Sequence, residues 1–262
     1  MSEHFLEAVL PNEQPDLDPA RPAELARLAE DLGYRAAWLP DHLLPPSPYG
    51  EVFGGVYEPL VTLAHIAART SRIRLGTSVL IVPLREPFAL AKQVATLDRL
   101  SGHRFDLGVG TGWNEPEFAE VGADFGTRGR QTDTTLDLLA DLFRTGRGPG
   151  GGYFEPRPDG PVPVTVGGNS AAALRRAARI GTTWQSAGLP PAEFGERVAT
   201  LRQLAGGRAV RAVARARWRD DARTTAADVR AFRAAGADAV AVHFGGHEGT
   251  ERRLAELAAA VD

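Results

Sequence analysis

The feature that most constrains this chain is a regular alternation of short apolar runs with longer amphipathic runs along nearly its whole length. The short runs are rich in strand-forming residues, whereas the long runs repeat apolar residues at helical spacing. The predicted strands span 5–10, 36–39, 73–82, 105–109, 163–166, 183–185, 210–218 and 239–244. The predicted helices span 23–33, 58–70, 87–101, 132–143, 171–179, 191–204, 225–235 and 248–261.

About eight strands alternating with about eight helices is the count of a (β/α)8 TIM barrel. We therefore predict an α/β fold with one barrel domain over residues 1–262. A doubly wound sheet is the alternative. The glycine-rich run Gly146–Gly152 could link two domains, but the alternation resumes after it, so we expect a loop within one domain. For the last-but-one helix, Thr225 and Asp228 predict a capping box.

Composition excludes several classes of protein. The chain has no cysteine, which rules out disulfides, thiolate metal ligands and cysteine nucleophiles. A formal net charge of −3 gives no basic footprint for nucleic acid. We find no basic leader and no apolar run of about 18 residues, the length needed to span a membrane. We expect a cytoplasmic protein that binds a small molecule and neither nucleic acid nor membrane.

In a barrel, ligand chemistry lies in the loops that follow the strands. The stretch from Arg104 to Glu117 shows such a loop, because Gly108, Gly110 and Gly112 follow apolar residues and let the backbone approach a ligand. Taken alone, this pattern also fits an ordinary strand-to-helix turn. Residues at the other strand ends include Asn12, Asp41, His42, Ser78, Val79, Thr111, Trp113, Gly167, Gly168, Asn169, Ser170, Trp184, Gln185 and residues 245–247.

Four long segments carry a resemblance to a known family. They are LPDHLL, IRLGTSVLIVPLREPFALAKQVATLDRLSGHRFDLGVGTGWNEPEF, GTRGRQTDTTLDLLADLF and PVPVTVGGNSAAALRRAARIGTTWQ. Together they resemble the bacterial luciferase-like monooxygenase superfamily, and most closely its branch that uses the deazaflavin coenzyme F420. The resemblance implies a barrel that binds a reduced flavin or deazaflavin at the C-terminal mouth, usually as a homodimer.

The resemblance also assigns roles to particular residues. Asp41 and His42 match a catalytic pair beside the reactive ring, with the histidine as acid or base. From the residues alone, Asp41 could instead cap a loop and His42 could be a buried structural residue. Ser78–Val79 matches a non-proline cis peptide that contacts the central ring of the cofactor.

A phosphate of the cofactor is expected at Gly167–Ser170, since this loop precedes a helix whose N–H groups favour an anion. A plain helix cap by Asn169 or Ser170 is the alternative reading, and Gly245–Gly246 is a competing phosphate loop. The expected cofactor contacts are Asn12, Ser78, Val79, Gly110, Thr111, Gly112, Gly167, Gly168, Asn169, Ser170, Trp184 and Gln185.

The chain departs from its relatives at two places. Trp113 stands where sugar-phosphate dehydrogenating relatives have a glutamate, and residues 181–184 lack the acid of an Asp-Gly-Trp motif. Shortened loops indicate a small, open or partner-completed pocket. Trp113, Phe53 and Tyr57 predict contacts to a largely apolar organic substrate.

The predicted function is an F420-dependent oxidoreductase that transfers hydride to or from such a substrate. The proton relay at Asp41–His42 favours a deazaflavin, whereas a monooxygenase using flavin mononucleotide (FMN) would need a closed, dry pocket. FMN remains the alternative cofactor. A flavin-binding protein without catalysis and a metal-dependent barrel hydrolase using Asp41, His42, His243 and His247 are further alternatives, although no metal-binding spacing appears.

Overall fold

In a computed structural model, which describes residues 5–46 and 57–261, the strands form one closed parallel barrel. The order around the sheet is β3-β2-β1-β9-β8-β7-β6-β5-β4, and an additional β3–β5 pairing closes it. The strands are β1 (Leu6–Val9), β2 (Ala36–Leu39), β3 (Arg74–Thr77), β4 (Leu80–Ile81), β5 (Phe105–Gly110), β6 (Val164–Gly167), β7 (Thr183–Gln185), β8 (Arg211–Arg217) and β9 (Ala239–His243). The predicted barrel is confirmed.

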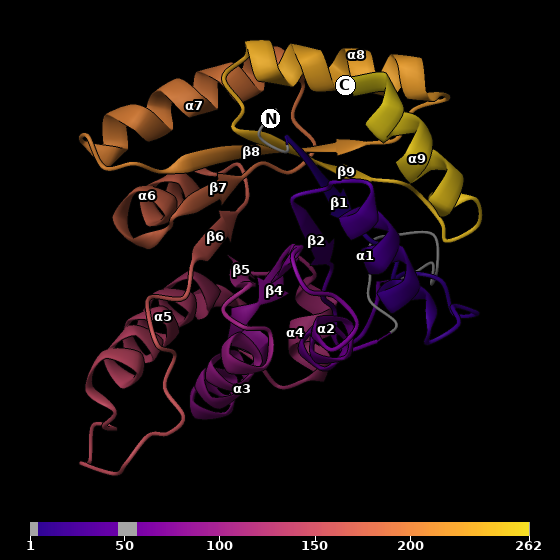
Figure 1. Ribbon diagram of the computed structural model, residues 1–262. Coiled ribbons are helices and arrows are strands. Elements are labelled where there is room, and N and C mark those ends of the chain that lie inside the picture. The colour runs from indigo at the N-terminus through magenta and orange to yellow at the C-terminus, as the bar shows by residue number, and fades with distance from the viewer. Residues whose placement is uncertain (1–4, 47–56, 262) are drawn as a thin grey trace.

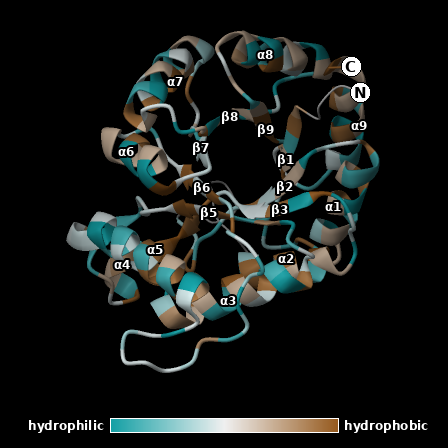
Figure 2. Cartoon of the chain, turned by 60° about the vertical axis from the view of Figure 1, so that its left-hand side comes forward, coloured by the Kyte–Doolittle hydropathy of each residue, from teal (hydrophilic) through white to brown (hydrophobic). Residues whose placement is uncertain are grey.

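The helices form an outer ring around the strands, with their hydrophilic faces outward (Figures 1 and 2). They are α1 (Arg21–Asp31), α2 (Pro59–Ala67), α3 (Pro87–Leu100), α4 (Glu115–Glu120), α5 (Arg128–Thr145), α6 (Ala171–Ile180), α7 (Pro191–Ala205), α8 (Ala222–Ala234) and α9 (Thr250–Val261), with short 3-10 turns η1 (Val82–Leu84) and η2 (Phe125–Thr127). No helix in the described part of the chain is long and apolar enough to cross a membrane.

Three sequence-based boundaries need correction. The strand predicted over 73–82 is interrupted between β3 and β4, because the chain leaves the regular ladder at Ser78–Val79. Helix α5 begins at Arg128, four residues before the predicted start. Helix α8 is capped by Asp221, whose carboxylate accepts a hydrogen bond from the Thr224 N–H at 2.7 Å, so the predicted Thr225 capping box is wrong.

The barrel has two apolar layers. A large core fills the space between strands and helices, and a small cluster fills the barrel interior with mostly small side chains. The inner cluster consists of Val9, Ala36, Trp38, Val213, Ala239 and Ala241. The indole of Trp38 fits there because Gly76 lacks a side chain: a Cβ at this position would lie 2.2 Å from the ring. Its N–H donates to the buried carboxylate of Glu7 at 2.8 Å.

Candidate functional site

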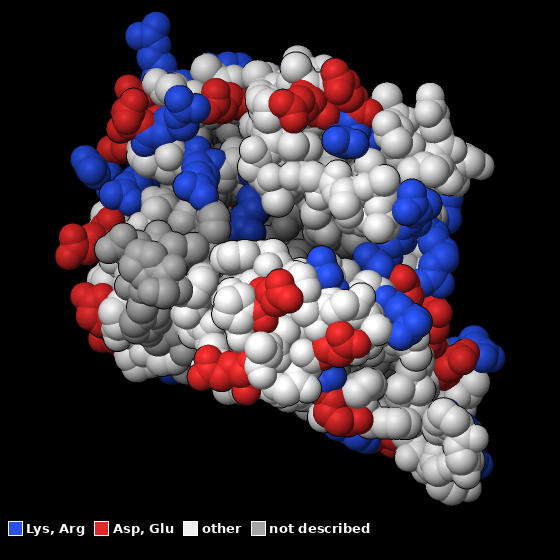
Figure 3. Space-filling view, turned by 180° about the vertical axis from the view of Figure 1, so that it is seen from behind, with Lys and Arg blue, Asp and Glu red and all other residues white. Residues whose placement is uncertain are grey.

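A pocket of about 950 Å³ lies at the C-terminal ends of the strands. Seen from behind, the molecule has a hollow near its centre with cationic side chains inside it (Figure 3). The residues that line the pocket include Asp41, His42, Ser78, Val79, Gly110, Thr111, Gly112, Trp113, Arg128, Gly167, Gly168, Asn169, Ser170, Arg176, Arg215, Arg217 and His243.

Of the 17 residues predicted from the sequence for the site, 12 line the pocket. The other five are Asn12, Phe53, Tyr57, Trp184 and Gln185, and Phe53 lies outside the described residues.

The wall formed by β4, β5 and β6 is shaped around Val79. The Ser78–Val79 peptide is cis and lines the pocket, as the sequence resemblance predicts. A Cβ at Gly110 would lie 2.5 Å from Val79 Cγ2, and one at Gly167 would lie 2.6 Å from Val79 Cγ1. Both glycines are therefore required for the Val79 side chain to sit between the two strands.

Ser78 is held by side chains from β7 and β8. Its hydroxyl donates to Gln185 Oε1 at 2.6 Å, and its carbonyl accepts from Arg215 Nη1 at 2.8 Å. Gln185 is buried, does not line the pocket and contacts Ser78, which does. The sequence did not single out Arg215 or Arg217 as pocket residues, and it named His243 only as a metal ligand in the hydrolase alternative; the pairing of β8 with β9 brings all three to the pocket.

The partner of His42 is Glu117 on α4. The His42 Nδ1 and Glu117 Oε2 atoms lie 2.7 Å apart, and both residues are buried. The other carboxylate oxygen accepts from the N–H groups of Leu43 and Leu44 at 2.7 and 3.0 Å. Burial disfavours the charged carboxylate, but these hydrogen bonds outweigh it and lower the pKa of Glu117 below its usual value.

Sequence reasoning missed Glu117 as a site residue. It ends the glycine-rich stretch noted above, but its partner is 75 positions away, and local spacing carries no signal of that contact. Asp41 and His42 both line the pocket, but their side chains have different partners: His42 Nδ1 meets Glu117, and the Asp41 carboxylate meets Ile81 and Arg85. Their predicted catalytic role stays a prediction.

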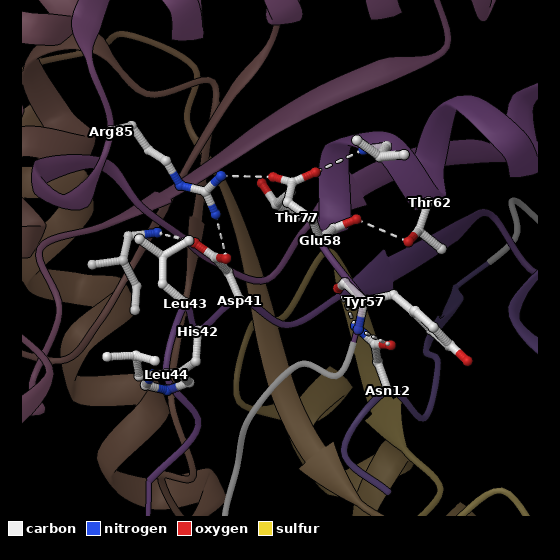
Figure 4. A network of polar contacts seen from close by, with 12 residues as sticks. Asn12, Asp41, His42, Leu43, Leu44, Tyr57, Glu58, Thr62, Thr77 and Arg85 are labelled. Atoms are coloured by element: carbon white, nitrogen blue, oxygen red, sulfur yellow. Dashed lines mark hydrogen bonds and ion pairs between the residues drawn. The ribbon is translucent and has the colours of Figure 1, made fainter. Parts of the chain in front are cut away.

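Asp41 belongs to a separate ion-pair network (Figure 4). Its carboxylate accepts from the Ile81 N–H at 2.8 Å and from Arg85 at 2.5 Å, and Arg85 also contacts Glu58 at 2.6 Å. Burial raises the pKa of Asp41, and Arg85 opposes that rise. Asp41 thus connects the end of β2 to β4 and to the start of α2, which indicates a positioning role.

The Gly167–Ser170 loop connects β6 to α6 at the pocket. Ser170 caps the helix, with its hydroxyl accepting from the Ala173 N–H at 3.1 Å. Asn169 instead exchanges two hydrogen bonds with the backbone of Ala187, at 2.7 and 2.9 Å. Gly168 has φ +111°, a conformation that favours glycine. The competing loop at residues 245–246 does not line the pocket.

Two cationic side chains stand beside this loop. Arg176 of α6 forms a paired contact with Asp133, at 2.8 and 2.9 Å. Arg128 donates to the carbonyls of Phe125 and Gly112. The N-terminal ends of α5 and α6 therefore meet at one side of the pocket, which favours a negatively charged group there.

The remaining predicted residues of the described chain do not line the pocket and form hydrogen bonds to the backbone of other segments. Asn12 is buried, and its side-chain amide donates to the Tyr57 carbonyl at 2.9 Å, while the Tyr57 hydroxyl donates to the Leu17 carbonyl at 2.6 Å. The Trp184 indole N–H donates to the Gly168 carbonyl at 2.8 Å, and its ring stacks on Phe194. Within residues 5–46 and 57–261, no three acidic or histidine side chains are grouped to hold a metal ion.

Comparison with known proteins agrees with this geometry. A profile of the luciferase-like monooxygenase family matches residues 5–260, and the chain belongs to this family. It is 34% identical over 208 residues to an uncharacterized protein of Mycobacterium tuberculosis, covering 69% of each chain. It is 33% identical over 201 residues to 4-hydroxyprotoasukamycin monooxygenase of Streptomyces nodosus subsp. asukaensis, covering 71% of this chain and 52% of that one.

Solved structures share the fold at low sequence identity. An F420-dependent secondary alcohol dehydrogenase in complex with an F420-acetone adduct superposes with a TM-score of 0.84 at 14% identity, covering 99% of both chains. The coenzyme F420-dependent tetrahydromethanopterin reductase of Methanopyrus kandleri gives 0.80 at 18% identity, also covering 99% of both. Family membership indicates an oxidoreductase.

Proposed function

We propose that this protein is an F420-dependent oxidoreductase that transfers a hydride to or from a small, largely apolar organic substrate. The observation that carries the proposal is His42, which lines the same pocket as Val79 and is held from behind by the buried carboxylate of Glu117. When bound, the reduced deazaflavin supplies the hydride. A proton must also move during such a reaction, and His42 is placed to donate or accept it.

The pocket fits a flat ring on one wall. The Val79 side chain lies between Gly110 and Gly167, where an added Cβ would clash with it. This wall therefore consists of one apolar side chain flanked by two residues without side chains. The N-terminal ends of α5 and α6, with Arg128 and Arg176, would hold the phosphate that follows the ring. We therefore assign Gly167–Ser170 to phosphate binding.

Glu117 orients the histidine. Glu117 engages Nδ1, and His42 lines the pocket, so we assign the proton transfer to its other ring nitrogen, Nε2. Trp113 packs edge-on against the imidazole with ring centroids 5.6 Å apart and is 57% exposed. Trp113 also lines the pocket, so the wall beside His42 offers apolar contact to a substrate.

An FMN-dependent monooxygenase is the second candidate. It is favoured by the 33% identity to a monooxygenase, whereas the F420 enzymes share only 14 to 18% identity with this chain.

We also propose a homodimer, since Val61 of α2 and Phe88 of α3 are 68% and 46% exposed. Light scattering in solution would test the dimer.

Anaerobic titration with each reduced cofactor tests the choice between them. Micromolar binding of reduced F420, followed by absorbance, is the expected result. Binding of FMN alone, with oxygen consumption in the presence of an organic substrate, would refute the deazaflavin assignment. Tight binding without turnover of any substrate would instead support a flavin-binding protein.

A further inference from the structure

Ser78 is held from across the barrel. Strand β8 is four strands away from β3 in the sheet order β3-β2-β1-β9-β8, which places it on the opposite wall. Arg215 reaches from β8 to the Ser78 carbonyl, at 2.8 Å, and Gln185 of β7 meets the Ser78 hydroxyl at 2.6 Å. A polar bridge therefore spans the barrel interior next to the wall formed by Val79.

Arg215 brings a positive charge to this bridge. Burial lowers the pKa of Arg215 to about 10, so the guanidinium is still a cation at neutral pH. Glu13 attracts it and Arg217 repels it. The carboxylate of Asp41, which also lines the pocket, is engaged by Arg85. Arg215 also lines the pocket, so a ring resting on Val79 has this cation close to it.

We propose that Arg215 is a positioning residue that favours the reduced, anionic form of the bound cofactor over the oxidised form. This inference rests on the proposed function. An oxidised ring that accepts a hydride gains one negative charge, unless a proton follows. A fixed cation beside the ring stabilises that added charge, so it favours the reduced form over the oxidised form, which carries one negative charge fewer.

The test compares the affinities of the two redox forms for the full chain. Oxidised and reduced F420, and separately FMN, are titrated under anaerobic conditions and followed by absorbance. In the wild-type protein we expect the reduced form to bind at least about tenfold more tightly, which raises the two-electron potential of the bound cofactor by about 30 mV.

Two substitutions at Arg215 separate its charge from its hydrogen bond. R215Q keeps a donor toward the Ser78 carbonyl but removes the charge, so the preference for the reduced form should fall toward one. R215K keeps the charge and should retain most of the preference. Q185M is the matched control, because it removes the contact to the Ser78 hydroxyl without changing any charge.

Equal affinities of both forms for the wild-type protein would overturn the inference, even if R215Q fails to fold. An unchanged preference in R215Q would also overturn it, as would an equal loss in Q185M, which would indicate a structural role. If neither cofactor binds the wild-type protein, the proposed function itself fails. If the wild-type protein binds the cofactor, and its preference for the reduced form disappears only in R215Q, the result supports both the role of Arg215 and the proposed function.

Discussion

Replacing Glu117 by glutamine tests whether the buried carboxylate is ionised. The carboxylate accepts three hydrogen bonds, from His42, Leu43 and Leu44. A bond to a charged group contributes about 1.5–3 kcal/mol and a neutral one about 0.5–1.5 kcal/mol. A loss of about 1 kcal/mol for each bond therefore predicts that E117Q lowers the free energy of unfolding by about 2–3 kcal/mol at pH 7.

The effect should depend on pH in a defined direction. Because the pKa of Glu117 is lowered in the folded protein, its stabilising contribution is complete above the unfolded value of 4.5 and is lost as the pH falls through the folded value. The difference between wild type and E117Q should therefore shrink below about pH 4.5. Urea denaturation at pH 7 and pH 4 measures it.

A matched control lies on the same helix. Glu120 is exposed at the end of α4, and E120Q should change stability by less than about 0.5 kcal/mol. A difference below about 0.5 kcal/mol for E117Q at pH 7, or an equal difference at both pH values, would show that Glu117 is not held as a charged partner of His42.

Three further predictions concern stability and turnover. G108A should lower the free energy of unfolding by about 3 kcal/mol or more, because its Cβ would lie 1.6 Å from a backbone oxygen of β3. G129A is the control and should be tolerated, because the nearest atom to its Cβ in α5 would be 3.8 Å away. Thermal unfolding compares the two variants. R85A should cost about 3–5 kcal/mol by leaving Asp41 buried without its partner, and adding D41N should recover part of that loss in urea denaturation. H42N should lower turnover by about 10²-fold with cofactor affinity within a few-fold, and unchanged turnover would show that His42 is structural.

The sequence predicted the barrel because its apolar periodicity repeats with each strand and helix. Residues 36–39 and 183–185 agree with β2 and β7 to the residue. The contacts that organise the site were not predictable in this way. Glu117 and His42, or Arg215 and Ser78, are 75 and 137 positions apart, and only the closed sheet brings each pair together.

The placing of polar side chains also depended on three-dimensional packing. Asp41 could be expected near a ligand from its position after β2, but its oxygens are satisfied by Ile81 and Arg85, which belong to the next part of the barrel. Trp184 likewise lies near the end of a strand, but its indole N–H donates to the Gly168 carbonyl and its ring stacks on Phe194. Strand-end position predicts proximity to the pocket, whereas orientation depends on neighbours.

The ion pairs that join Asp41, Arg85 and Glu58 fix the two ends of the chain segment 42–57. Asp41 lies just after β2, and Glu58 begins α2, so Arg85 ties together the chain entering and leaving the intervening stretch. Asn12 adds a second tie at Tyr57. The barrel thus holds both ends of this segment in fixed positions, so a segment of other sequence or length can be exchanged between them without redesigning the scaffold.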